Sequence, residues 1–460
     1  MRGKPKARAL RSITAIGAAV LGAAPALAGE IRPLTLDDCL AYADRHNLDL
    51  RIAYTQLEVS GAHVREAGAR YLPSLSLDGY YTQYDTAPTQ AVTLSPQIQR
   101  ILQRLAPNQP NLSSNFTVET TPQNPSDMKL AVSQPLFTSG KLYTTLQLRR
   151  DEQRVGALQE RGLHADVLLA VEESFDELLL AEEGRALNED VAMLTATVRG
   201  DAEHRFAAQA ASRMELLEAE SAHTRAQLPL LRAREDVRLR RDTLAHLIGW
   251  SEDTPLEIAG ALVFAAVQLD ADALVKRALV DRPDVQLVQQ QIAVRERELT
   301  AVQLAGTPSL SLVGAYEFVQ RARNDLPENV LSGGIVLSWP ILEGGTIVPR
   351  VQAARLAVEE AMLRREQLRA NVGFEVRRAV TAVTVAEDAY RTQQRVVDTA
   401  RERVRVTEAG VGVGTAAPVA LANERLALLD ARLAEAQLRF EHVIARARLA
   451  RVVGAPPGKL

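Results

Sequence analysis

This sequence has few of the residues that build catalytic or metal sites. Of its 460 residues only 4% are aromatic and one is a cysteine, Cys39. A lone cysteine cannot form an internal disulfide, and we expect Cys39 to act as a small apolar residue on a helix face. The seven histidines are dispersed, without the spacing of a local metal site. Neither Gly-x-Ser-x-Gly nor His-Glu-x-x-His occurs. We therefore expect no enzyme activity, no cofactor and no metal.

The sequence also lacks an excess of charge of either sign. It has 54 lysine and arginine residues against 57 aspartate and glutamate residues, a formal net charge of −3. This balance gives no electrostatic reason to expect a nucleic acid as partner. Beyond residue 28 no run of about 20 apolar residues occurs, so no transmembrane helix is predicted.

Two patterns that resemble functional sites have simpler interpretations. The run GVGVGT at 410–415 resembles a phosphate-binding loop, but it follows a helical pattern rather than a strand, which favours a turn between two helices. The acidic pairs Glu172-Glu173 and Asp176-Glu177 are interpreted as the solvated face of a long helix.

The N-terminus has the three parts of a secretory signal peptide. A basic stretch is followed by the short apolar run ITAIGAAVLGAA, and Ala26-Leu27-Ala28 fits a cleavage site. We expect cleavage after Ala28, so that residues 1–28 are removed. The alternative is an N-terminal membrane anchor, but the run is short for a membrane span.

Three pairs of similar segments indicate an internal duplication. PSLSLDG at 73–79 recurs as PSLSLVG at 308–314, SQPLFTSG at 133–140 corresponds to SWPILEGG at 338–345, and SRMELLEA at 212–219 corresponds to TAAPVALA at 415–422. The order is the same in both copies, as expected of a repeat. We predict a first repeat at 29–250, a connector at 251–270 and a second repeat at 271–460.

Each repeat changes between a strand period and a helix period. Apolar and polar residues alternate near 73–84, 128–138, 308–318 and 333–342, which predicts strands with one apolar face. Prolines at their ends mark helix-to-strand junctions: Pro73, Pro135, Pro308 and Pro340. The insert at 85–127 is rich in Pro, Gln, Asn and Ser, which predicts a loop.

Very long helices follow the strands of each repeat. From Lys141 to His204 the sequence has no proline, which predicts a rod of about 96 Å. A second proline-free stretch covers 350–408, and apolar residues with a 3.5-type period predict coiled-coil packing. Pro229 lies within the first returning helix, where we expect a bend or break.

This organisation predicts an oligomer. Four short strands leave two sheet edges unpaired, and they are too few to close a barrel that passes a solute. Three chains would supply twelve strands, within the range of outer-membrane barrels. The long helices would likewise cover their exposed apolar flanks by assembling around one axis.

Several segments resemble the TolC family of outer-membrane efflux channels. They are LTLDDCLAYADRHNLDLR, YLPSLSL, SQPLF, SRMELLEAES, SWPILEGG and EAGVGVGTAAPVALANERL, in this order over about residues 34–454. The resemblance implies an α+β membrane protein with a duplicated helix-strand-strand-helix-helix repeat. Its long antiparallel coiled-coil helices would form a periplasmic α-barrel. Its four strands would join a trimeric 12-stranded β-barrel in the outer membrane.

The resemblance also implies a location and partners. The location would be the outer membrane, with a large periplasmic part. The partners would be two further copies of the chain, outer-membrane lipid, a periplasmic adaptor protein and an inner-membrane transporter. The channel would be a passive conduit for small solutes or drugs, driven by that transporter. One alternative is the conduit of a type I protein secretion system, and a more distant one is a secreted helical scaffold without a pore.

The two turns between long helices are the predicted gate and adaptor contact. Turns of the family commonly carry an Ala-Gly step, which the second turn keeps, whereas Gln209 stands at the glycine position of the first. Basic residues flank both turns, so a purely acidic gate is not supported. The candidate residues are Arg205, Gln209, Ser212, Arg213, Arg403, Arg405, Glu408, Gly410, Gly414 and Thr415.

Overall fold

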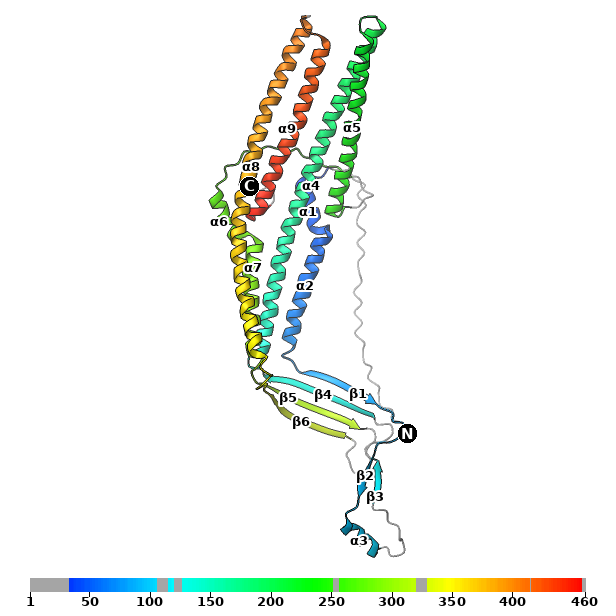
Figure 1. Cartoon of the computed structure of the whole chain (residues 1–460), viewed down its shortest axis with the longest axis vertical. Coiled ribbons are helices and arrows are strands. Elements are labelled where there is room, and N and C mark those ends of the chain that lie inside the picture. Colours follow the sequence, from blue (N-terminus) through cyan, green and yellow to red (C-terminus); the bar gives the residue numbers. More distant parts are fainter. Residues whose placement is uncertain are drawn as a thin grey trace, which may run out of the picture.

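The computed structural model describes residues 33–105, 115–119, 126–250, 256–319, 329–413 and 415–456. The predicted signal peptide, residues 1–28, lies outside the described residues. The molecule is elongated, with long helices over most of its length and a sheet toward one end (Figure 1). In the described part, no helix has the length and hydropathy that crossing a lipid bilayer requires.

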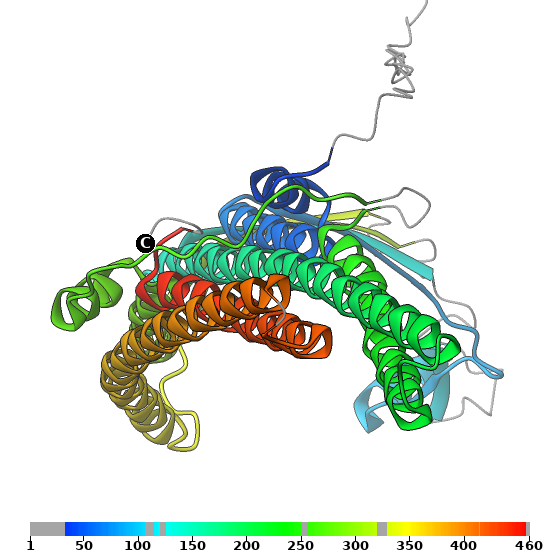
Figure 2. The same ribbon diagram turned by 90° about the horizontal axis from the view of Figure 1, so that it is seen from above.

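Two antiparallel pairs of long helices form the main body. α4 (Lys141–Ala207) pairs with α5 (Arg213–Ile248), and α8 (Ile347–Gly412) pairs with α9 (Pro418–Val453). At ~1.5 Å per residue, α4 is roughly 100 Å long. Viewed along the long axis, these helices follow an arc with α5 toward one end and α8 toward the other (Figure 2).

A bend or break was expected at Pro229, and the break is wrong, because α5 is continuous through that residue. A proline in a helix removes one backbone hydrogen bond and leaves a carbonyl without its partner. Pro229 lies on an exposed part of α5, so water can bind that carbonyl. The packing of α5 along α4 keeps the rest of the helix in place.

Four shorter helices extend the body toward the sheet. α1 (Leu36–His46) begins with a capping box between Thr35 and Asp38, and the side chain of Asn47 caps α2 (Leu48–Ala69). In the second half, Asp270 caps α6 (Ala271–Asp281), and α7 (Pro283–Leu304) begins with proline at its first position. α2 and α7 both pack against α4, and α7 also packs against α8.

A four-stranded antiparallel sheet lies at the end of these helices. Its strands are β1 (Ser74–Tyr81), β4 (Ser126–Phe137), β5 (Ser309–Val319) and β6 (Asn329–Ser338), in the order β1-β4-β5-β6. Each half of the chain supplies one pair of strands, and β4 and β5 join the pairs. The predicted duplicated order of helix, two strands, long helix and returning helix is therefore confirmed.

The predicted loop at 85–127 contains secondary structure, which corrects that expectation. β2 (Thr89–Thr93) and β3 (Asn115–Glu119) form a separate two-stranded sheet, and α3 (Pro96–Leu105) lies between them in sequence. The elements are short, and the many Pro, Gln and Asn residues around them conceal their periods. Figure 1 shows this unit extending beyond the main sheet, at the end opposite the long helical hairpins.

Buried residues form a hydrophobic core where α1, α4 and α5 meet. Cys39 is fully buried there with residues such as Val171, Leu178 and Leu244. Burial, and then the charge of Asp38, raise the pKa of the Cys39 thiol to about 11. Cys39 is therefore a neutral packing residue, as its place on a helix face predicted.

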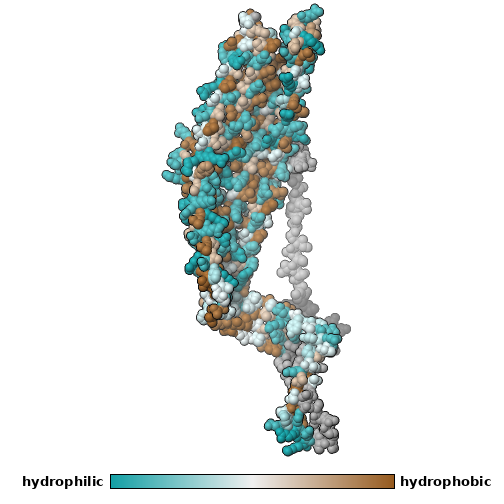
Figure 3. All heavy atoms as spheres, viewed as in Figure 1, coloured by the Kyte–Doolittle hydropathy of each residue, from teal (hydrophilic) through white to brown (hydrophobic). Residues whose placement is uncertain are grey.

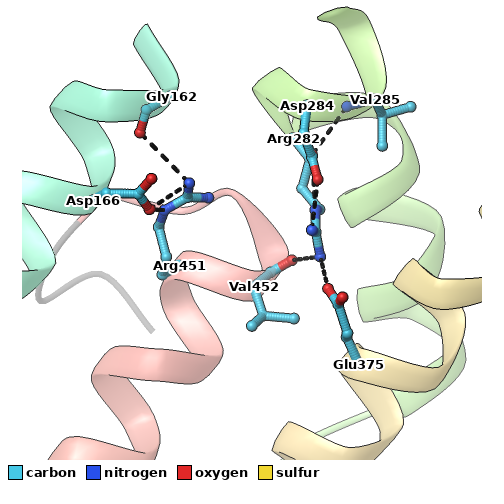
Figure 4. Close-up of polar contacts among 8 residues, drawn as sticks. All are labelled: Gly162, Asp166, Arg282, Asp284, Val285, Glu375, Arg451 and Val452. Carbon is cyan, nitrogen blue, oxygen red and sulfur yellow. Dashed lines mark hydrogen bonds and ion pairs between the residues drawn. The ribbon is translucent and has the colours of Figure 1, made fainter. Parts of the chain in front are cut away.

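Ion pairs join the two halves of the chain. Arg439, Arg448 and Arg451 of α9 pair with Glu183, Glu173 and Asp166 of α4, at distances of 2.5 to 2.7 Å. Figure 4 shows the junction beside the last of these pairs, where the polar contacts of Arg282 connect the start of α7 with α8 and α9.

Candidate functional site

The first helical tip, between α4 and α5, has a backbone conformation that usually contains a glycine, but no glycine is present there. The amide of Ala210 donates to the carbonyl of Arg205 at 2.7 Å, and that of Gln209 donates to Phe206 at 3.0 Å, which is the Schellman pattern. Gln209 has φ +58°, the left-handed conformation that glycine favours. The sequence prediction identified this position, and the turn keeps its shape with the glutamine in it.

Side chains of the predicted set hold this first tip together. Arg205 donates to Glu215 at 2.5 Å and to the Ala210 carbonyl at 3.4 Å. Ser212 caps α5 by accepting a hydrogen bond from the Glu215 amide at 3.1 Å. The guanidinium of Arg213 lies 5.8 Å from the centre of the Phe206 ring, a cation–π contact.

The second tip, between α8 and α9, is closed differently. The carbonyl of Gly410 accepts hydrogen bonds from the amides of Thr415 and Ala416, at 2.8 and 3.1 Å, and from the Thr415 hydroxyl at 3.1 Å. A Cβ at Gly410 would lie 3.1 Å from the Cβ of Ala416. Close approach, rather than a positive φ, is therefore the reason for glycine here. Gly414 lies outside the described residues.

The charges at the second tip are mixed and paired. Arg403 of α8 pairs with Glu424 of α9 at 2.7 Å, and Glu408 of α8 pairs with Arg425 of α9 at 2.9 Å. Arg405 forms two hydrogen bonds with Glu402, at 2.8 and 2.6 Å. Glu424 and Arg425 were missed from the sequence, because the spacing along one helix does not show which residues face it from the next.

The structure brings the predicted residues together in two groups. Arg205, Gln209, Ser212 and Arg213 belong to the first tip, and Arg403, Arg405, Glu408, Gly410 and Thr415 belong to the second. Both tips lie at the same end of the molecule (Figure 1). Sequence reasoning also missed exposed apolar side chains near both tips: Phe206, Met214, Leu217, Val406, Val413 and Val419.

The four prolines occupy different places around the sheet. Pro73 and Pro308 immediately precede β1 and β5. Pro135 lies within β4, where the register with β5 shifts between Pro135 and Phe137. Pro340 follows the end of β6 and precedes α8.

The sheet has one apolar face and one face that carries all of its charges. Residues directly opposite each other on neighbouring strands share a face, so the printed register assigns each side chain. Figure 3 shows hydrophobic residues gathered at this end of the molecule. The apolar face is formed by exposed side chains from all four strands: Leu75, Leu77, Met128, Leu130, Val132, Leu312, Tyr316, Phe318, Leu331, Ile335 and Leu337.

The opposite face carries the polar network of the sheet. Lys129 of β4 pairs with Glu317 of β5 at 2.6 Å. Tyr80 of β1 donates to Asp127 of β4, and Asp78 lies opposite Lys129. Leu331 on the apolar face is 81% exposed and Ile335 is 64% exposed. A single chain thus leaves a large apolar surface in contact with solvent, which is typical of an interaction surface.

The interpretation of the acidic residues of α4 as a solvated face is wrong for two of the four. Glu172 and Asp176 are buried, with relative exposures of 7% and 5%. α4 contacts α5 as well as α9 and α7, so more than one side of it is covered. Burial, and then the charges of Glu172 and Glu173, raise the pKa of Asp176 to about 7.

A buried histidine lies in α9. His442 is fully buried, and neither ring nitrogen has a hydrogen-bond partner among the described residues. The ring of Phe264, from the connector before α6, lies 4.6 Å from the His442 ring and 4.5 Å from the Tyr390 ring. Burial, and then the charge of Arg446, lower the pKa of His442. In the described part of the chain no group of His, Cys, Asp and Glu is placed to hold a metal ion.

Comparison with known proteins relates the second half of the chain to a family. Residues 274–455, from α6 to the end of α9, match the family described as outer membrane efflux protein. This match covers the second repeat of the chain, which is therefore similar to the outer membrane efflux protein family. The resemblance found in the sequence motifs is thereby confirmed. No curated protein sequence matches this chain.

Solved structures share the fold of this chain over most of its length. The outer membrane channel CmeC of Campylobacter jejuni is 17% identical, with 91% of this chain and 85% of that chain covered and a TM-score of 0.70. The outer membrane protein VceC of Vibrio cholerae is 14% identical, with coverages of 92% and 96% and a TM-score of 0.68. The open state of the MtrE outer membrane channel of Neisseria gonorrhoeae is 16% identical, with coverages of 91% and 89% and a TM-score of 0.70.

Proposed function

We propose that this protein is one subunit of a passive efflux channel that crosses the outer membrane and the periplasm. The observation that carries the proposal is the two-faced sheet. Its apolar face fits the hydrocarbon of a membrane, and its charged face fits a water-filled lumen. The channel would carry small solutes or drugs and would have no catalytic step of its own.

The assembly we propose is a trimer. β1 and β6 are the edge strands of the sheet, and unpaired edges are satisfied when a sheet closes. If β1 of one copy pairs with β6 of the next, three copies form a closed 12-stranded barrel. The helical arc supports the same closure, because α5 and α8 near its two ends expose apolar side chains, among them Leu231, Leu239, Leu363 and Phe374.

The proposed domain limits and location follow from this arrangement. Residues 1–28 would be removed on export. Residues 29–250 and 271–460 would be the two repeats, with 251–270 as the connector between them. The strands would lie in the outer membrane and the long helices in the periplasm. The insert at 85–127 would face the outside of the cell.

The proposed gate lies at the two tips, where the helical barrel ends in the periplasm. Interhelical pairs such as Arg403–Glu424 and Arg205–Glu215 would hold the closed tips in place, and an iris-like untwisting would open them. The exposed apolar side chains beside these pairs would contact a periplasmic adaptor, which would in turn connect the channel to an inner-membrane transporter. Energy would come from that transporter.

Disulfide crosslinking tests the barrel. In a Cys39→Ala background, a cysteine at Ser76 of β1 is combined in turn with one at Ser332, Val336 or Ser338, which share the charged face of β6. Because the strands of a closed barrel are staggered, one of these combinations is expected to link neighbouring copies into covalent trimers. A pair at Ser76 and Ala131, which are opposite each other within one chain, is the matched control and should link without changing the apparent mass. Covalent dimers as the final product, or a soluble periplasmic monomer, would reject the closed trimer.

Two further experiments test the gate and the orientation. Exchange of charge at Arg405 and Glu408 together should change the conductance and ion selectivity of the channel in planar bilayers. The gate would have to be placed elsewhere if both quantities and efflux stayed unchanged.

Cysteines introduced into the insert near Thr89 should react with a membrane-impermeant reagent on intact cells. Labelling only after lysis would reverse the orientation.

A further inference from the structure

α3 is an amphipathic helix whose apolar side has no partner. It spans Pro96–Leu105, between β2 and β3 of the insert. Its apolar residues recur at spacings of three and four, so they share one side of the helix. No described element packs against α3, and three of the four apolar side chains are exposed, Leu105 to 76%. The apolar stripe consists of Ile98, Ile101, Leu102 and Leu105.

The charges of α3 itself are all positive. Residues 86–118 contain no aspartate or glutamate, and their only charged residues are Arg100 and Arg104. Both arginines lie away from the apolar stripe, on the side that also carries Gln97 and Gln103. The rest of the sequence is rich in acidic residues, since the whole chain has 57 of them. Residues 86–118 are therefore a local exception in charge, bordered by Asp85 and Glu119.

The position of α3 in the molecule limits what it can contact. It lies beyond the sheet, at the end opposite the tips (Figure 1). If the sheet lies in the outer membrane, as the proposed function requires, α3 is on the outer side of that membrane. A helix of 10 residues is about 15 Å long, half of what a span requires. α3 can lie on a membrane but cannot cross it.

We propose that α3 docks on the anionic surface of the outer leaflet. The apolar stripe enters the boundary between headgroups and acyl chains, while Arg100 and Arg104 bind the phosphate groups of the lipids. This is the arrangement of interfacial helices, which combine a strong apolar side, basic residues on the polar side and low overall hydrophobicity. Arginine suits the role because its planar guanidinium binds phosphate oxygens in pairs.

Charge complementarity favours lipid over a second copy of α3. If the three α3 helices of a trimer packed their stripes together above the pore, six arginines would gather with no acidic residue of residues 86–118 to neutralise them. Like charges brought together in this way repel each other. An anionic membrane surface attracts the same arginines, and its attraction is weakened by salt.

The experiment uses the full-length protein in a Cys39→Ala background, with an environment-sensitive fluorophore on a cysteine at Leu105. The protein is reconstituted in vesicles of phosphatidylcholine alone, or of phosphatidylcholine with phosphatidylglycerol. In the anionic vesicles we expect a blue-shifted emission and about fivefold less quenching by aqueous iodide than in detergent. A reporter at Gln103, on the polar side, should change much less.

In anionic vesicles, the Leu105 reporter of the variant R100Q/R104Q should lose most of its protection from iodide quenching. Added salt should reduce the protection of the same reporter in the parent protein. The matched control R238Q/R295Q, which changes two arginines on other helices, should keep it. The reporter could instead be equally protected in detergent and in both kinds of vesicle, and Leu105→Cys could form crosslinks between copies. This result would show that a second copy covers the apolar stripe of α3, and it would overturn the proposal. Absence of protection in every sample would also overturn it.

This inference rests on the proposed channel, and the two can fail separately. Conductance is measured on the same labelled samples. A conducting channel whose Leu105 reporter stays exposed to iodide would reject the docking of α3 alone. A sample that inserts in vesicles but does not conduct would reject the channel.

Discussion

Arg282 and Glu375 form an ion pair of 2.7 Å that joins the start of α7 to the middle of α8. The same guanidinium forms two hydrogen bonds with Asp284, at 3.0 and 2.7 Å, and donates to the carbonyl of Val452 in α9 at 3.3 Å (Figure 4). The Arg282 side chain is only 9% exposed. Burial would raise the pKa of Asp284, but the hydrogen bonds and charge of Arg282 outweigh it and lower that pKa.

Replacement of Arg282 by methionine should therefore destabilise the protein. It removes four hydrogen bonds and leaves two carboxylates without their cation, so we expect a loss of about 2–4 kcal/mol in the free energy of unfolding. Arg277→Met is the matched control, because its ion pair with Asp281 is exposed on both sides, and it should cost less than about 1 kcal/mol. Denaturant unfolding in detergent measures both. Equal losses in the two variants would contradict this account of the junction.

Gln209→Gly should stabilise the first tip. In the folded state, a residue other than glycine in the left-handed conformation is strained by about 1–2 kcal/mol, and glycine relieves this strain. Part of the gain is offset because glycine also increases the conformational entropy of the unfolded chain. We expect a net gain of up to about 1 kcal/mol, measured as slower hydrogen exchange at Ala208 and Ala210. Gln227→Gly, in the interior of α5, should instead destabilise its helix by about 1 kcal/mol. Faster exchange at the tip of the Gln209 variant would contradict the prediction.

Asp176 should make the protein less stable as pH rises. Its pKa is about 7 in the folded chain against an ordinary value of 3.8, so between about pH 4 and pH 7 the folded state binds more protons than the unfolded state. Stability from this group is therefore greatest below pH 4 and is lost as pH rises through 7. Relative to the parent, Asp176→Asn should gain on the order of 2–4 kcal/mol by pH 8 and little at pH 4. Asp190→Asn, on an exposed part of α4, is the control and should show no such pH dependence.

Gly249→Ala should destabilise the end of α5. Gly249 has φ +73°, and a Cβ there would lie 2.8 Å from the carbonyl oxygen of His46, closer than real contacts allow. We expect a loss of about 2–4 kcal/mol from strain and displacement of α1. At Gly184 a Cβ would have nothing within 4 Å, so Gly184→Ala should raise stability by about 0.5–1 kcal/mol. A loss of stability in the Gly184 variant as large as that at Gly249 would refute this contrast.

Much of the fold could be predicted from the sequence, because its main elements are long and regular. The proline-free stretches gave the two longest helices, and the repeated PSLSL segment identified β1 and β5. The burial of Asp176 could not be predicted, since the period of one helix does not show how many neighbours surround it. α3 was missed because one short helix in a Pro- and Gln-rich insert has too few turns to establish a period. The break expected at Pro229 does not occur, and local propensity could not show this because it does not include the packing along α4.

The most direct test of the central claim is the conductance of the purified protein in planar lipid bilayers. We expect discrete, long-lived conductance steps from a trimeric species without any energy source. We also expect that substitution of Lys129 and Glu317, on the charged face of the sheet, changes ion selectivity, whereas a substitution of Leu331 on the apolar face by isoleucine does not. A membrane-inserted trimer that conducts no ions would contradict the account.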